Sequence, residues 1–126
     1  MKRSWFGLIL LLALLLGSLL CSYAMVRIHQ ENAEKLERAA QLALEENWPG
    51  AAFWTAQARH TWDKWEFLRA SLSDHNPSEE IDVLFAALEI YASAREETAF
   101  AAVCRETAKK MQAMGEAHSL KLQNIL

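Results

Sequence analysis

The sequence predicts an all-α fold, in which an N-terminal transmembrane helix is followed by a small antiparallel bundle of three or four helices. An uncharged run of 22 residues, Trp5–Val26, comes directly after the short basic start. Beyond it, apolar residues recur at helical spacing, and neither a strand-like alternation nor an Asn-Gly hairpin signal occurs. We therefore expect a basic N-terminus at residues 1–4, an anchor at 5–26 and a helical domain at 27–126.

The apolar run is long enough to cross a membrane. A helix rises about 1.5 Å per residue and the hydrocarbon core is about 30 Å thick, so about 20 residues are sufficient. A cleaved signal peptide has a shorter apolar region of about 7–15 residues, although Ser22-Tyr23-Ala24 is an alternative cleavage site. The uncleaved anchor is the favoured interpretation. Leu20 before Cys21 is too large for lipoprotein processing, so we expect no lipid at Cys21.

Charge sets the expected orientation and the class of partner. Lys2 and Arg3 resemble the start of a bacterial signal anchor, which predicts a single pass through the bacterial cell membrane and an extracytoplasmic domain. All 16 acidic residues but only eleven of the 13 Lys and Arg residues lie after Val26, so this part carries a formal net charge of −5. That charge disfavours nucleic acid and anionic lipid surfaces as partners.

The first two helices of the domain are separated by a clear break. The anchor helix is predicted to continue to about Glu46, and Asn47-Trp48-Pro49-Gly50 ends it, with the proline in the first turn of the next helix. The second helix is expected over residues 51–72. Its apolar stripe consists of Trp54, Ala58, Thr61, Trp65, Leu68 and Leu72, and a second line consists of Phe53, His60 and Phe67. Because a helix that is apolar on two sides is usually enclosed, we expect it at the centre of the bundle.

The rest of the chain predicts two further helices. The third begins near Pro77 and presents Ile81, Leu84, Phe85, Leu88, Tyr91 and Ala92. The fourth presents Phe100, Val103, Cys104, Thr107, Met111 and Met114. The apolar stripe changes direction near Arg95, which predicts a turn within residues 93–97.

Gly115 is expected to end the fourth helix, and the apolar tail is expected to pack back on the domain. The two hairpins form a bundle or, alternatively, stack like tetratricopeptide repeats.

The stretch from Ser73 to Asp82 holds one histidine and four carboxylates. Asn76 as N-cap, Pro77 as first helical residue and Glu79 in a capping box explain most of it as a helix start. The alternative is a metal or acid/base site on His75 and nearby carboxylates. We expect His75 to hydrogen-bond the start of the helix and to fix the preceding turn.

Other chemical signatures are missing from the sequence. The four histidines form no pair at metal-binding helical spacing, there is no nucleophile elbow, and the glycines form no phosphate loop. Cys104 lies on an apolar helix face, where a buried free thiol is the usual interpretation, and it is too far from Cys21 to suggest a disulfide. We expect no catalytic residue, no bound metal and no cofactor.

Two features suggest contacts with other proteins. Four of the five tryptophans, among them Trp48, Trp62 and Trp65, lie between residues 48 and 65, either as core or as a surface for a partner. In the span, Gly17-x-x-x-Cys21 and Ser18-x-x-x-Ser22 place small residues on adjacent faces, which would allow two copies to dimerise.

The order of these features resembles a bacterial family known as domain of unknown function number four-three-six-three, found mainly in Firmicutes. The resemblance rests on Glu46-Asn47-Trp48, Trp62, His75, Glu80-Ile81-Asp82 and the ending from Leu120 to Leu126. Here Asn76-Pro77-Ser78-Glu79 separates the histidine from E-I-D, and Gln123 stands where the family usually has lysine. The resemblance implies a small membrane-anchored helical protein, with another small integral membrane protein as a plausible partner.

The functional prediction is a non-enzymatic interaction or accessory module of the bacterial envelope. Its candidate interaction residues are Trp48, Trp62, Trp65, His75 and Asp82. One alternative is a small metal-binding protein or enzyme that uses His75. The other is a structural envelope protein that oligomerises through its span.

Overall fold

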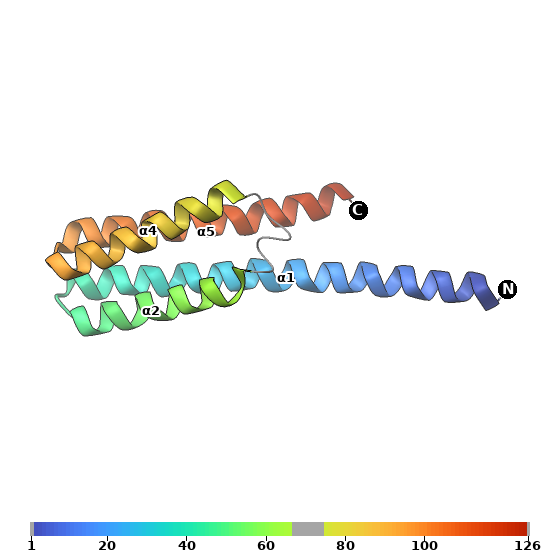
Figure 1. Ribbon diagram of the computed structural model, residues 1–126, viewed down its shortest axis with the longest axis horizontal. Helices are drawn as coiled ribbons and strands as arrows, with labels where there is room; N and C mark the ends of the chain where they lie inside the picture. The colour runs from blue at the N-terminus through green and yellow to red at the C-terminus, as the bar shows by residue number, and fades with distance from the viewer. Residues whose placement is uncertain (1, 67–74, 126) are drawn as a thin grey trace.

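The computed structural model describes residues 2–66 and 75–125, without the side chains of residues 75–77 and 118–125. These residues form α1 (Lys2–Leu44), α2 (Trp48–Lys64), α4 (His75–Ala94) and α5 (Glu97–Ile125), as Figure 1 shows. Among them α1 is the one helix that is long and apolar enough to cross a membrane. The predicted all-α bundle behind a long apolar N-terminal helix is confirmed.

The first hairpin turns where α1 ends. Glu46 adopts the left-handed conformation with φ 63°. The Asn47 N–H donates to the carbonyl of Leu42 at 2.8 Å, and the Glu46 N–H donates to that of Ala43 at 3.0 Å. This pattern is a Schellman motif, which satisfies the last carbonyls of the helix. Asn47 then caps α2, because its Oδ1 accepts the Gly50 N–H at 3.1 Å. The predicted break at Asn47 is therefore confirmed.

The second hairpin repeats this turn. Arg95 has φ 55°, and the Glu96 N–H donates to the Tyr91 carbonyl at 3.0 Å. The predicted turn within residues 93–97 is confirmed. Both turns lie at the end of the bundle that is distant from the N-terminus of α1 (Figure 1). There desolvation, followed by the negative charge of Glu46, raises the pKa of Glu97.

The centre of the bundle is the antiparallel pair α1 and α5. α1 packs most extensively on α5 and then on α2, whereas the backbones of α2 and α4 come close at only a few points. Small residues allow the close approach, and the fully buried ones on α1 include Ala33, Ala39, Ala40 and Ala43. The larger core side chains, which include Trp62, Phe85, Phe100 and Met111, close the bundle over this pair.

The expectation that the second helix lies at the centre is wrong. Phe53 is 54% exposed and His60 is also exposed, so the second apolar line of α2 faces outward. α2 buries only the face that carries Ala51, Ala58 and Trp62. Its expected range was also too long, because α2 ends at Lys64, and the expected end at Leu72 lies outside the described residues.

Two helix boundaries also differ from the sequence expectation. α4 begins at His75, so Asn76 lies in its first turn rather than at the cap. Pro77 is tolerated there because the first four N–H groups of a helix have no intrahelical partner. Gly115 does not end α5, which continues to Ile125. A Cβ at Gly115 would lie 3.7 Å from the Val26 Cα, so this glycine marks a close approach of α5 to α1.

We predict that Arg95→Gly stabilises the fold. A non-glycine residue in the left-handed conformation costs about 1–2 kcal/mol, and glycine is the usual residue at this position of the motif. A gain of about 1 kcal/mol corresponds to a rise of about 4–8 °C in the unfolding temperature. Circular dichroism of the full chain in detergent micelles would measure it. Arg95→Ala is the matched control, because it removes the guanidinium but keeps the strain. An Arg95→Gly variant that melts no higher than Arg95→Ala would contradict this account.

Candidate interaction surface

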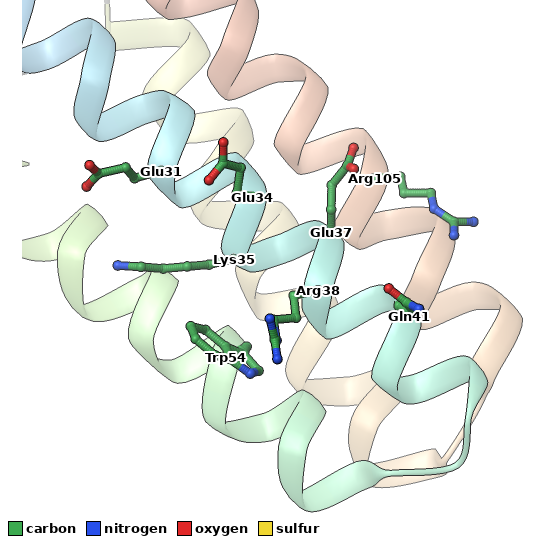
Figure 2. Close-up of a pocket in the computed structure, with 8 residues that line it drawn as sticks. All are labelled: Glu31, Glu34, Lys35, Glu37, Arg38, Gln41, Trp54 and Arg105. Atoms are coloured by element: carbon green, nitrogen blue, oxygen red, sulfur yellow. The ribbon is translucent and has the colours of Figure 1, made fainter.

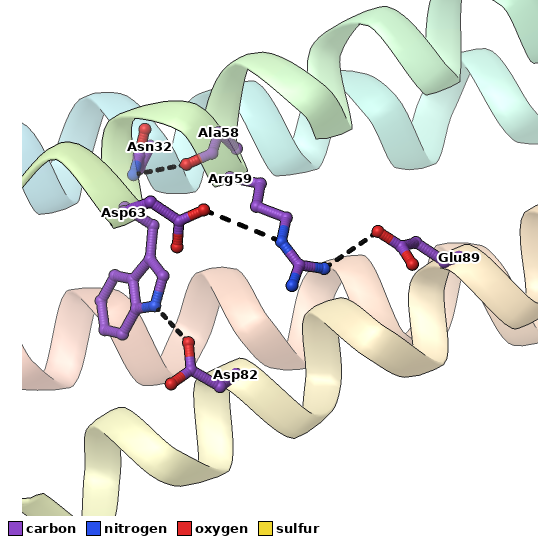
Figure 3. Close-up of polar contacts among 7 residues, drawn as sticks. Asn32, Ala58, Arg59, Asp63, Asp82 and Glu89 are labelled. Atoms are coloured by element: carbon purple, nitrogen blue, oxygen red, sulfur yellow. Dashed lines mark hydrogen bonds and ion pairs between the residues drawn. The ribbon is translucent and has the colours of Figure 1, made fainter. Parts of the chain in front are cut away.

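Two of the candidate residues, Trp62 of α2 and Asp82 of α4, meet across the bundle. The indole of Trp62 is 1% exposed, and its ring centroid lies 6.1 Å from that of His29 and 6.4 Å from that of Phe85. Its Nε1–H donates to Asp82 Oδ1 at 2.8 Å, the bond that Figure 3 draws to Asp82. Trp62 is therefore a core residue whose one polar group is satisfied by a carboxylate of the neighbouring helix.

Arg59 forms a second link between α2 and α4. Its Nη1 donates to Glu89 Oε1 at 3.0 Å, and its Nε lies 3.9 Å from Asp63 Oδ2 (Figure 3). The guanidinium also lies 5.9 Å from the centroid of Phe85. Because these groups are well exposed, the ion pairs add little to stability. The pair of Arg59 with Glu89 connects α2 to α4, whose backbones come close at only a few points.

A groove of about 380 Å³ opens between α2 and α4 beside these contacts. Its floor consists of the buried side chains of Phe85, Leu88 and Phe100. The α2 wall contributes Ala52, Thr55 and Ala56, all small residues that would let another backbone come close. The charged rim consists of Arg59, Asp63 and Glu89, with His60 beside them. An apolar floor with a polar rim is the usual construction of a site that binds an amphipathic helix.

The charges along this groove are mostly negative. Asp63 and Glu89 contribute two carboxylates to the groove lining, against the single guanidinium of Arg59. The groove therefore shares the acidic character of the whole domain, and it would favour a positively charged partner.

A broader hollow of about 600 Å³ lies on the exposed face of α1 (Figure 2). Arg38 lies over Trp54 at 5.1 Å from the ring centroid, and Lys35 Nζ donates to Thr61 Oγ1 at 3.2 Å. The charges here alternate in sign along α1, and they fasten α1 to α2. An alternation of this kind is typical of a solvated helix face and carries no preference for a ligand.

The exposed face of α4 is a competing apolar surface. Val83 and Ile90, one heptad apart, are 67% and 66% exposed. They stand outward rather than lining a cavity, whereas the α2–α4 groove combines a buried floor with walls from two helices.

The remaining predicted residues are spread over the fold. Trp48 is half-buried and packs edge-to-face on Phe100 at 5.4 Å. Trp65 is half-buried at the end of α2, where the Lys64 ammonium lies 5.8 Å from its ring centroid. Glu79 is exposed near the start of α4. The side chains of His75 and Asn76 lie outside the described ones, so the hydrogen bond expected of His75 stays a prediction.

Two buried polar residues on α1 escaped the sequence analysis. Asn32 is fully buried and its Nδ2 donates to the Ala58 carbonyl at 3.2 Å, while no described group donates to its Oδ1. His29, also buried, lies against Trp62. The available signal was their spacing, because Met25, His29, Asn32 and Leu36 recur on one helix face. A polar residue in such a stripe is easily misread as a break in it.

The described part of the chain contains no group of three His, Cys, Asp or Glu side chains that could hold a metal ion. Cys104 is buried, and burial raises the pKa of its thiol to about 12. The thiolate is the nucleophilic form, so Cys104 is an inert core residue at neutral pH, as its place on an apolar face predicts.

Comparison with known proteins supplies a family but no characterised relative. The family model described as "Domain of unknown function (DUF4363)" matches residues 20–125. Neither a curated protein nor a solved structure matches the chain significantly.

We predict that Trp62 and Asp82 are energetically coupled. Asp82→Ala leaves the buried Nε1–H of Trp62 without its acceptor, which should lower the free energy of unfolding by about 1–3 kcal/mol. In a Trp62→Phe background the same substitution should cost less than about 0.5 kcal/mol, because the donor is gone. Thermal unfolding of the four proteins in detergent micelles would close the cycle. Additive effects would show that the bond contributes nothing.

Proposed function

We propose that this chain, which belongs to the DUF4363 family, is a non-enzymatic, membrane-anchored module that docks onto another protein of the bacterial envelope. The observation that supports this most is the groove between α2 and α4. It joins a buried apolar floor to an acidic rim on a bundle that continues directly from a candidate membrane span.

The fitting partner is an amphipathic helix with basic flanks. Its apolar side chains would enter over Phe85, Leu88 and Phe100, and the small wall residues of α2 would let its backbone approach. Lys or Arg residues beside that apolar face would lie over Asp63 and Glu89. Acidic partners would meet like charge at this rim, so charge supplies selectivity more than affinity.

The position of the groove limits where the partner can bind. α1 continues without interruption from Lys2 to Leu44, so the bundle follows the span with no flexible linker. Leu44 lies 18 positions after Val26, which corresponds to a rise of about 27 Å along the helix. One end of the groove lies near the turns at Glu46 and Arg95, because its lining includes Ala52, Ala92 and Phe100. A helix projecting about 25 Å from a neighbouring membrane protein would reach it.

The proposal includes an extracytoplasmic domain. The short basic start before the span and the acidic domain after it support this orientation. The alternative of a metal site or enzyme built on His75 gains no support from any described contact. Oligomerisation through the span is the structural alternative, and the cross-linking experiment below separates it from docking.

Site-specific photo-cross-linking in intact cells tests the docking surface. A benzophenone amino acid at Ala56, in the groove, should form an adduct with one other envelope protein. The same probe at Ile90, on the competing α4 face, should not. Asp63→Lys should lower the Ala56 adduct at least about threefold by reversing a rim charge. Glu66→Lys makes the same charge change at an exposed residue just after the end of α2, outside the groove lining, and is the matched control.

Three results would contradict docking at this groove. They are adducts at Ile90 rather than Ala56, equal effects of Asp63→Lys and Glu66→Lys, and adducts only between copies of the chain. The last would favour the structural alternative.

Labelling of single cysteines in intact cells tests the orientation. In a Cys21→Ser, Cys104→Ala chain, a membrane-impermeant maleimide should label Gln112→Cys without lysis, because Gln112 is exposed on the bundle. Lys2→Cys, on the other side of the span, should be labelled only after permeabilisation. The reverse pattern would place the domain in the cytoplasm.

A further inference from the structure

α5 extends beyond the bundle, alongside the apolar part of α1. Gly115 packs against Val26, where an added Cβ would lie 3.7 Å from the Val26 Cα. α5 then continues for ten more residues to Ile125, which corresponds to about 15 Å. In Figure 1 this end of α5 extends past the end of α2 in the direction of the N-terminus of α1. The same distance back along α1 from Val26 reaches about Leu16.

The apolar half of α1 carries one stripe of lower exposure. Leu15 is 39% exposed, whereas its neighbours Leu14 and Leu16 are 65% and 59% exposed. The partly covered residues of this half of the span recur at helical spacing and include Leu19, Ser22 and Val26, and Leu15 continues the same line. Because Val26 belongs to this stripe and faces Gly115, the stripe lies on the side of α5.

The apolar run of α1 is only slightly longer than the hydrocarbon core is thick. Its 22 residues rise about 33 Å, against about 30 Å for the hydrocarbon core. Trp5 and Tyr23, residues that favour the two membrane interfaces, are 18 positions or about 27 Å apart. A bilayer that covers this span therefore extends to the part of α1 that α5 accompanies.

The sequence of this end of α5 is compatible with lipid. After Glu116 it contains no acidic side chain, and Lys121 is the one Lys or Arg. Its apolar residues Leu120, Leu122 and Ile125 are interspersed with the uncharged polar residues Ser119, Gln123 and Asn124 and with His118, a composition that suits the headgroup boundary. A helix satisfies its own backbone hydrogen bonds except at its last turn, and a lysine stem can extend toward the headgroups.

We infer that the residues of α5 after Glu116 form a second membrane contact, entering the leaflet on the domain's side beside α1. This inference rests on the membrane anchor of the proposed function. Two adjacent helices at the membrane surface resist tilting better than one. The contact would therefore fix the angle and height at which the α2–α4 groove is presented.

Depth-dependent quenching tests this contact. The full chain with Cys21→Ser and Cys104→Ala is reconstituted in phosphatidylcholine vesicles that contain lipids with nitroxide on the acyl chains. An environment-sensitive fluorophore is attached to Leu122→Cys, with Leu16→Cys as the control inside the span and Gln112→Cys as the control on the bundle. Circular dichroism confirms that each labelled protein keeps its helix content.

We expect the fluorophore at Leu122→Cys to emit at short wavelength and to be quenched like that at Leu16→Cys, whereas Gln112→Cys reports water. Emission and quenching at Leu122→Cys that match Gln112→Cys would overturn the inference while leaving the anchor intact. An aqueous signal at Leu16→Cys would instead refute the anchor and, with it, both proposals. The two failures are therefore distinguishable.

Discussion

The close packing of α1 against α5 is the constraint on which the other features of this fold depend. Ala33, Ala39, Ala40 and Ala43 are fully buried on α1, and Gly115 on α5 continues the contact toward the apolar half of α1. Small residues let the two backbones approach, so the outer helices are each held mainly by one of them, α2 by α1 and α4 by α5. The outer pair is consequently left apart. Large side chains, chiefly Trp62 of α2 and Phe85 of α4, fill part of the space between these two helices. The groove is the part of this space that no side chain fills.

Polar contacts then fix the register of the outer helices, which apolar packing alone specifies loosely. Asn32 donates to the backbone of α2 at Ala58, and Trp62 donates to Asp82 of α4. Each bond requires one alignment of two helices, because a slip by one turn would leave a buried donor unsatisfied. The exposed ion pair of Arg59 and Glu89 favours the same alignment of α2 and α4 but contributes little to the free energy of folding. The contact with Asn32 of α1 therefore positions α2, and the bond from Trp62 to Asp82 positions α4 relative to α2. Together these two contacts set the width of the groove.

The sequence predicted those features that depend on local chemistry. The break at Asn47 and the turn around Arg95 were both recognisable, one from a cap and a proline and the other from a shift of the apolar stripe. Features that depend on which helix lies opposite were not predictable from one chain. Phe53 extended the apolar surface of α2 and suggested a central helix, yet no neighbour covers it within the described fold. Gly115 suggested a helix end because glycine often marks one, whereas its role here is set by Val26 across the interface. The meeting of Trp62 with Asp82, and the groove itself, follow from placement in space rather than from spacing.

The same packing links the proposed anchor to the proposed docking site. No break separates the apolar half of α1 from the half that carries Asn32 and the buried alanines, so a rotation or tilt of the span would be transmitted to the bundle. A single helix would leave that tilt free. α5 packs along α1 as far as Gly115, so the two helices form a rod that is stiffer than a single helix. The negative charge of the domain repels anionic headgroups and favours an upright rod over one lying on the surface. A groove held upright, at a fixed height and with an acidic rim can select a partner by geometry as well as by charge, and such selection requires no catalytic group.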